Sequence, residues 1–157
     1  MDGQSGPRTQ MYIFTATTPD RDGTIDADVL YHECSHGLSI RLHGPQGTLG
    51  TGAQSRGMGE GWGDFFGTCL NAEPSDDFTG VYTTGGYVTQ QFSTAIGNNN
   101  YYFGIRRYPY SVDFNKNPLT YNDVDPAQAN NAATPAPIAD NGGGAGEVHN
   151  VGEVWCN

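Results

Sequence analysis

The chain has few basic residues and no long run of apolar residues. Only 7 of its 157 residues are Lys or Arg, against 17 Asp and Glu, so the formal net charge is −10. Binding to nucleic acid depends on clustered positive charge, which this composition does not offer. No apolar stretch approaches the roughly 20 residues that a membrane-spanning helix needs. We therefore expect neither nucleic acid nor a membrane as a partner.

Cysteine is also scarce and follows no metal-binding spacing. The three cysteines are Cys34, Cys69 and Cys156, and their spacing gives no C-x-x-C pattern. Because their number is odd, at least one thiol is unpaired. One disulfide is compatible with this set, but the sequence does not choose the pair. The N-terminal residues lack the basic segment and apolar core of a signal peptide, so either the chain stays in the cytoplasm or its natural N-terminus lies elsewhere.

What the chain has in abundance is glycine, with 23 residues, while hydrophobic residues reach only 36%. The length fits a single domain, residues 1–157. Many glycines indicate much loop and several close approaches between backbone segments.

The predicted elements are short strands and a few helices. They are a strand at 10–16, a helix from Asp26 to about Leu42, a glycine-rich helix at about 58–71, a hairpin at 81–89 with a Gly-Gly turn, a long surface loop at 125–146 and a last helix from 147 to 155. For 81–89, a helix beginning near Tyr87 is the competing interpretation.

The first helix carries His32-Glu33-Cys34-Ser35-His36, an H-E-x-x-H motif. Two histidines four residues apart share one helix face, because a turn takes about 3.6 residues. Their imidazoles can hold one zinc ion together, with the glutamate beside a water on the metal. Cys34 lies about 200° around the helix from both histidines, so we expect it to pack rather than to bind metal.

A catalytic zinc needs a third protein ligand, and Glu60 on the second predicted helix is the candidate. Asp64 lies four residues later on the same face, where its carboxylate can accept a hydrogen bond from a ligand histidine. Glu33 would act as general base, taking a proton from zinc-bound water and passing it to the leaving amine. His43 falls near the helix end, so we expect it at the surface or behind the ligands.

Motifs are spread along the chain. They are Met11-Tyr12, Pro19-Asp-Arg-Asp-Gly23, His32-Glu-x-x-His-Gly-Leu-Ser39, Arg41, Gly57-Met-Gly-Glu-Gly-Trp-Gly-Asp64, Gly104-Ile-Arg-Arg-Tyr-Pro-Tyr-Ser111, Asn117-Pro-Leu-Thr-Tyr121 and Val148-His-Asn-Val-Gly-Glu-Val-Trp155. Together they resemble the fungalysin family of secreted zinc endopeptidases. The resemblance implies a thermolysin-like α+β fold, in which active-site helices, short strands and long loops frame a cleft between two lobes. It also implies His32, His36 and Glu60 as zinc ligands, with Glu33 as the catalytic glutamate.

Two further site residues come from this resemblance. His149 matches a family histidine and would hydrogen-bond the oxyanion of the tetrahedral intermediate, oriented by either Glu147 or Asp140. Arg106 would reach a substrate carbonyl, and a structural ion pair is its alternative role. Tyr108 and Tyr110 are weaker candidates for the same wall of the cleft.

The resemblance also implies parts that this chain lacks. Family members have a secretion signal, an inhibitory propeptide and a helical C-terminal lobe, so we expect a truncated catalytic domain of a longer, secreted parent. Its substrate would be a protein or peptide. The alternative is a truncated remnant that binds zinc or peptide without turnover; a hydrolase with a Ser or Cys nucleophile has no G-x-S-x-G support.

Calcium is the other metal that the sequence suggests, from Asp20 to Asp26. If Gly23 took the invariant glycine position of a calcium loop, Thr18 and Val29 would occupy the first and last ligand positions, and neither suits calcium. We expect instead a turn that caps the active-site helix.

Overall fold

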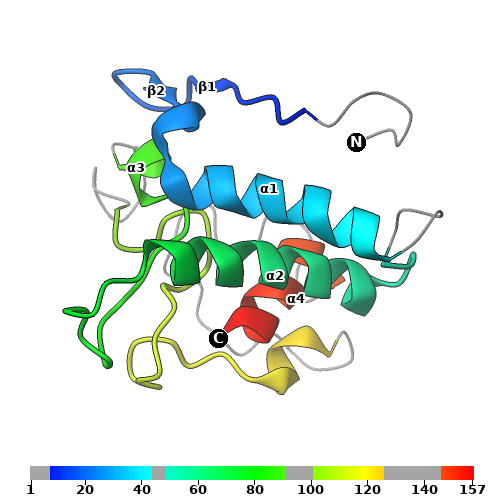
Figure 1. The fold of residues 1–157 in the computed structure, drawn as a ribbon. Coiled ribbons are helices and arrows are strands. Elements are labelled where there is room, and N and C mark those ends of the chain that lie inside the picture. The colour runs from blue at the N-terminus through cyan, green and yellow to red at the C-terminus, as the bar shows by residue number, and fades with distance from the viewer. Residues whose placement is uncertain (1–7, 44–48, 91–100, 126–145) are drawn as a thin grey trace.

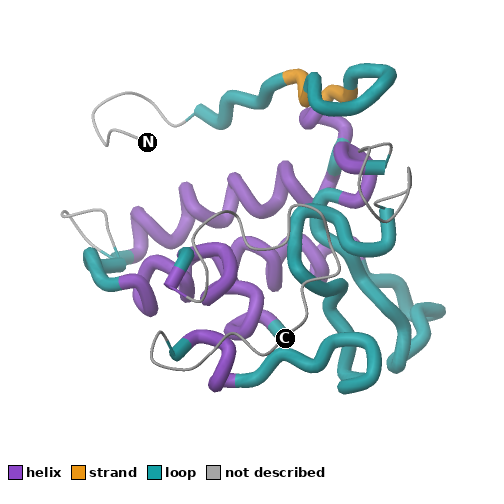
Figure 2. The backbone as a smooth tube through the Cα atoms, turned by 180° about the vertical axis from the view of Figure 1, so that it is seen from behind, coloured by secondary structure: helices purple, strands orange, loops and turns teal. Residues whose placement is uncertain are grey.

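The computed structural model describes residues 8–43, 49–90, 101–125 and 146–157. Its three longest helices are α1, α2 and α4. α1 covers Ala27–Leu42, α2 covers Ala53–Asn71 and α4 covers Val148–Cys156. α2 packs against both of the other helices, so it is the central element (Figure 1). Seen from behind, long loops gather at the end where α1 begins and α2 ends (Figure 2).

Strands are minor in the described residues. β1, Ile13–Phe14, pairs antiparallel with β2, Arg21–Asp22, and this ladder is shorter than the strand predicted at 10–16. A 3₁₀ turn, η1 at Gly23–Ile25, leads from β2 toward α1. This mixture of helices with few strands is compatible with the α+β class, while the thermolysin-like arrangement stays a prediction.

α1 begins where Asp26 caps it, next to the predicted start, and ends at Leu42 as expected. One oxygen of Asp26 accepts a hydrogen bond from the Val29 backbone at 3.4 Å, as an N-cap does. The other oxygen accepts from the Val88 backbone at 3.1 Å, which ties the start of α1 to a segment 62 residues away.

The predicted hairpin at 81–89 is wrong. Gly85 has a left-handed backbone with φ of 70° and leads into a short helix, α3, at Gly86–Thr89. The competing interpretation, a helix near Tyr87, is the closer one. The physical reason is that Tyr82 finds its bridge partner in Tyr110, far along the chain, instead of in the same segment.

α2 begins at Ala53, earlier than the predicted residue 58, and its glycines explain how it packs. A Cβ added to Gly61 would lie 2.6 Å from the Gly152 carbonyl oxygen, and one added to Gly57 would lie 2.4 Å from Val151. The expected close packing of backbone against backbone is thus confirmed. Tertiary contact between α2 and α4 outweighs the poor helix propensity of glycine.

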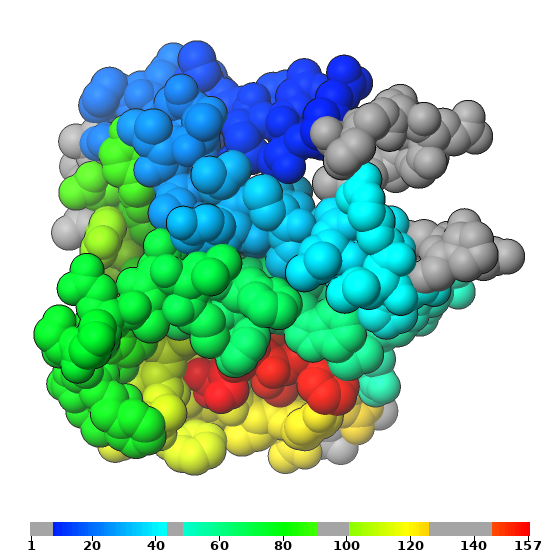
Figure 3. Space-filling view, viewed as in Figure 1, coloured from blue at the N-terminus to red at the C-terminus, as the bar shows by residue number. Residues whose placement is uncertain are grey.

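Polar groups fill much of the interior of the described residues. Only five hydrophobic side chains are buried there, against fifteen polar or charged ones that include Asp64, Arg106, Arg107 and Glu153. α4 reaches the surface between α2 and the 101–125 segment (Figure 3). Among the described helices, none combines the length and apolarity needed to cross a membrane.

A second short 3₁₀ element, η2, covers Tyr121–Val124.

Candidate metal centre

α1 and α2 bring three ligand atoms together, as the sequence predicted. The Nε2 atoms of His32 and His36 lie 2.9 Å apart on one face of α1. Oε2 of Glu60, on α2, lies 3.1 Å from the first of these nitrogens and 3.3 Å from the second. The three ligand atoms all fall within 4.8 Å of one another, in the one such group among the described residues.

Asp64 lies behind the ligands and holds His32 in place. Its Oδ1 is 2.7 Å from His32 Nδ1, which leaves Nε2 directed at the cluster. Arg106 donates to the same carboxylate from Nε at 2.6 Å and from Nη2 at 2.8 Å, and the Tyr110 hydroxyl donates to Oδ2. With a relative exposure of 1%, Asp64 is a fully buried charge that these three donors satisfy.

The local sequence of α2 is what admits this arrangement. Glu60 and Asp64 are four residues apart and therefore share a face of α2. Between them, a Cβ on Gly63 would lie 2.4 Å from His32 Nδ1. Any side chain at residue 63 would occupy the place of the imidazole, so glycine is required for close approach.

His149 reaches the same cluster from α4. Its Nε2 lies 3.3 Å from Glu60 Oε2, and its Nδ1 lies 2.8 Å from Glu147 Oε1. The Glu147 carboxylate also caps α4 by accepting from the backbone of His149 and Asn150. Of the two residues proposed to orient His149, Glu147 makes this contact, and Asp140 lies outside the described residues.

Glu33 follows His32 on α1 and is exposed. Its carboxylate is not one of the clustered ligand atoms. Glu33 is thus next in sequence to a residue of the cluster without belonging to the cluster itself.

The charges of the cluster are coupled. Burial would lower the pKa of His32, but hydrogen bonds to Asp64 and Glu60 outweigh it and raise this pKa to about 9. Burial would raise the pKa of Glu60, yet the bonds from both histidines hold that pKa well below its ordinary value. For Asp64, burial is likewise outweighed, chiefly by the positive charge of Arg106, and the pKa is lowered. In the metal-free protein the carboxylates are therefore ionised.

Arg106 takes the ion-pair alternative of the two predicted for it. Arg106 is 3% exposed, and its Nε and Nη2 donate side by side to the two carboxylate oxygens of Asp64. The structure therefore shows Arg106 in an ion pair, the alternative role predicted for it, with Asp64 as its partner. Tyr110 is also buried, while Tyr108 is half-buried.

The remaining candidates lie away from the ligands. Cys34 is exposed, and all three cysteines are free. His43 is the C-cap of α1 and its Nδ1 contacts the Ser39 carbonyl at 2.8 Å. Asp22 accepts a hydrogen bond from the Thr24 backbone, and Asp26 caps α1. Both side chains therefore stabilise the turn that was predicted to cap this helix. Neither Asp22 nor Asp26 belongs to a cluster of three or more His, Cys, Asp or Glu side chains among the described residues.

Sequence reasoning missed a second buried arginine. Arg107 pairs with Glu153 on α4 through Nε and Oε2, 2.9 Å apart, and both side chains are 0% exposed. The available signal was two consecutive arginines in a chain with 7 basic residues, flanked by apolar and aromatic residues. The role of Tyr110 as a donor to Asp64 was missed as well.

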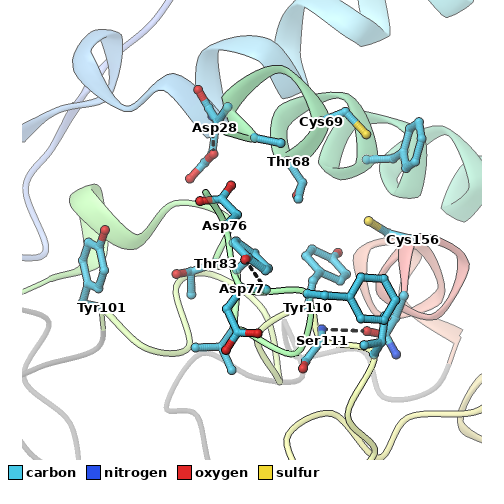
Figure 4. Close-up of a pocket in the computed structure, with 18 residues that line it drawn as sticks. Asp28, Thr68, Cys69, Asp76, Asp77, Thr83, Tyr101, Tyr110, Ser111 and Cys156 are labelled. Carbon is cyan, nitrogen blue, oxygen red and sulfur yellow. Dashed lines mark hydrogen bonds between the residues drawn. The ribbon is translucent and has the colours of Figure 1, made fainter. Parts of the chain in front are cut away.

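A cavity of about 600 Å³ lies next to this site without containing the ligands. Its wall includes Asp28 and Tyr110, and the Tyr110 hydroxyl donates to Asp64. Burial raises the pKa of Asp28 to about 6, although a hydrogen bond from Asn71 acts to lower that pKa. Cys69 and Cys156 project toward this cavity from α2 and α4 (Figure 4). The convergence of metal-binding atoms, rather than the size of a cavity, therefore locates the candidate centre.

The donor set fits zinc. Two imidazole nitrogens and one carboxylate oxygen form a common set for catalytic zinc, which keeps a fourth position open. The cluster is open to solvent on one side, since the side chains of His36 and His149 are 26% and 39% exposed.

Comparison with known proteins points to the same chemistry. Residues 1–157 match the family model described as Fungalysin metallopeptidase (M36). Extracellular metalloproteinase 1 of Trichophyton equinum is 40% identical over 157 residues, which are 99% of this chain and 21% of that protein. Extracellular metalloproteinase MEP of Neosartorya fischeri and Extracellular metalloproteinase mep of Aspergillus niger are each 38% identical over 99% of this chain and 20% of their own lengths. The chain thus spans about a fifth of these curated relatives.

Proposed function

Because this chain belongs to the fungalysin family of metallopeptidases, we propose that it forms the catalytic core of a secreted zinc endopeptidase. His32, His36 and Glu60 would hold the zinc ion. The substrate would be an extended segment of a protein or peptide. Secretion is supported by the relatives, which are named extracellular.

The observation that carries this proposal is the convergence of two histidines and one glutamate from two helices within 4.8 Å. A bound zinc ion would supply Lewis acidity, polarising the scissile carbonyl and lowering the pKa of water. Asp64 holds His32 in the orientation that presents Nε2. Arg106 and Tyr110 in turn hold Asp64.

Two residues of this chain would move or stabilise charge during hydrolysis. Glu33 is exposed next to His32 and would accept a proton from the attacking water, then deliver it to the leaving amine. His149, fixed by Glu147 through Nδ1, would donate from Nε2 to the developing oxyanion. His149 lies near Glu60 Oε2, which agrees with a position beside the ligands.

The test is hydrolysis of a quenched fluorescent protein substrate by the chain, with and without a phenanthroline chelator. We expect cleavage that the chelator stops and that added zinc restores. Absence of cleavage by folded, zinc-loaded protein would favour the alternative, a metallopeptidase remnant without turnover.

A matched variant separates metal binding from catalysis. In Glu33→Gln the amide cannot accept the proton, so we expect turnover to fall by about a hundredfold or more. Zinc content, measured by atomic absorption, is expected to stay equal to that of the unchanged chain. Loss of zinc in this variant would contradict the role given to Glu33, since it is not one of the three clustered ligands.

A further inference from the structure

The ion pair between Arg107 and Glu153 joins a loop to α4. Arg107 Nε donates to Glu153 Oε2 at 2.9 Å, and Arg107 Nη2 donates to the Asn150 carbonyl at 2.8 Å. The other oxygen of Glu153 accepts from the Tyr108 backbone at 2.7 Å. One loop segment thus holds α4 at two successive points, Asn150 and Glu153.

The pair is fully buried, at 0% exposure on both sides. Removing two charges from water costs about as much as their attraction returns, so such a pair adds little net stability. Its directional bonds do something that apolar packing would not do. They define one position of α4 relative to the loop.

His149 depends on that position. It lies one residue before Asn150 and four before Glu153, in the first turn of α4. Its Nε2 lies 3.3 Å from Glu60 Oε2, so a small displacement of α4 would move the imidazole relative to the ligands. Displacements of about 1 Å can reduce catalysis by a hundredfold.

The adjacent arginine, Arg106, stabilises the part of the site formed by α1 and α2. Arg106 binds Asp64 on α2, and Asp64 binds His32 on α1. Two consecutive side chains therefore bind two different helices: Arg106 binds α2, and Arg107 binds α4, the helix that carries His149. Tyr110 adds a further bond to Asp64 from the same segment.

We propose that Arg107 is a positioning residue, which sets the place of His149 opposite the metal ligands by holding Glu153 and the Asn150 carbonyl. Its kinetic consequence rests on the proposed peptidase function. Its structural consequence, the placement of the His149 ring, does not.

The kinetic test is a double-mutant cycle of Arg107→Lys and His149→Ala. Lysine keeps the charge but cannot hold Glu153 and the Asn150 carbonyl together, because it lacks the fork of the guanidinium. We expect Arg107→Lys to lower kcat about tenfold with KM and zinc content unchanged. In the His149→Ala background the same change is expected to have no further effect on kcat. An equal loss in both backgrounds would overturn the proposal, because it would show a general structural defect.

A second readout needs no turnover. The ring-proton NMR signals of His149, assigned by their loss in His149→Ala, are expected to shift and broaden in Arg107→Lys. Those of His32 and His36 are expected to stay in place. Unchanged His149 signals in folded Arg107→Lys would overturn the proposal. Failure of the proposed function would appear differently, as absence of hydrolysis by the unchanged, folded chain.

Two further variants complete the design. Arg41→Lys is the control, since Arg41 is exposed on the last turn of α1, and it is expected to leave the His149 signals unchanged. If Arg107→Lys does not fold, the pair can be replaced together as Arg107→Met with Glu153→Leu, a change that often preserves stability. Displaced His149 signals in that folded double variant support the proposal, and unaltered signals contradict it.

Discussion

At the residue scale, His32 shows how one side chain is held from two sides. Its Nδ1 contacts a carboxylate that is 1% exposed, and its Nε2 faces the other ligands. Gly63 leaves room for the ring. The orientation of the ligand therefore depends on Asp64 as much as on the helix that carries the histidine.

Asp64→Asn is predicted to weaken zinc binding by about 10- to 100-fold, because His32 loses its carboxylate partner. The variant also leaves Arg106 as a buried charge without its counter-ion, which is expected to cost about 3–5 kcal/mol of unfolding free energy. Competition with a chelating dye measures the first effect and urea unfolding the second. Asp20→Asn, at an exposed carboxylate, is the control. Unaltered zinc affinity in Asp64→Asn would show that the contact does not support the ligand.

Stability of the metal-free protein is predicted to depend on the proton of His32. Its pKa is raised from 6.5 to about 9, so the folded state holds this proton more tightly than the unfolded state. The resulting stabilisation is complete below about pH 6.5 and is lost as the pH rises through about 9.

The expected decrease in unfolding free energy over that window is a few kcal/mol, since one pKa unit corresponds to about 1.4 kcal/mol. Urea unfolding of metal-free protein at successive pH values measures it, with His32→Gln as the variant that lacks the dependence. A flat profile in the unchanged chain would argue against the coupling of His32 to its two carboxylates.

At the element scale, α2 decides the geometry, because it supplies Glu60 and Asp64 and packs against both α1 and α4. Its glycines let two helix backbones approach. A Cβ added to Gly61 would approach the Gly152 carbonyl oxygen, which is a backbone atom. A Cβ added to Gly59 would approach only Leu49 Cδ1, the end of a flexible side chain.

This difference gives a paired prediction. Gly61→Ala would place Cβ 2.6 Å from the Gly152 oxygen and is expected to destabilise the fold by about 1–3 kcal/mol. Gly59→Ala is expected to be neutral or stabilising by up to about 1 kcal/mol, since alanine favours the helix and Leu49 can move. Urea unfolding of the two variants measures the contrast. Similar effects in both would show that α2 and α4 are not in close backbone contact.

At the largest scale, a bound metal ion would join two helices that are otherwise held by close packing at glycines and by polar contacts. His32 and His36 lie on α1 and Glu60 on α2, so the proposed zinc ion would tie these two helices together. Few hydrophobic side chains are buried in the described residues, and we therefore expect the metal to contribute much of the stability.

Saturating zinc is predicted to raise the Tm. At a zinc concentration of about 100 times Kd the stabilisation is about 2.7 kcal/mol. For a chain of this size that corresponds to a shift of roughly 5–10 °C. A thermal-shift titration measures it, and Glu60→Ala, which removes one ligand, is expected to shift far less at the same zinc concentration. Equal shifts in the two proteins would point to a different third ligand.

The parts of the site that follow from local geometry could be predicted from the amino-acid sequence. His32 and His36, like Glu60 and Asp64, are four residues apart, and helical periodicity alone places each pair on one face. Asp26 as the cap of α1 is a local choice of the same kind. The family resemblance, confirmed by the family match, came from contiguous motifs as well.

Contacts between residues far apart in the sequence could be seen only once the chain was folded. Arg106 had two candidate roles, and it is the position of Asp64, 42 residues away, that makes it an ion-pair partner. The replacement of the predicted hairpin by α3 and the pair of Arg107 with Glu153, 46 residues apart, were settled in the same way. Spacing along a helix is set by the backbone, whereas contacts between segments depend on how closely glycine lets the helices pack and on which buried charges need partners.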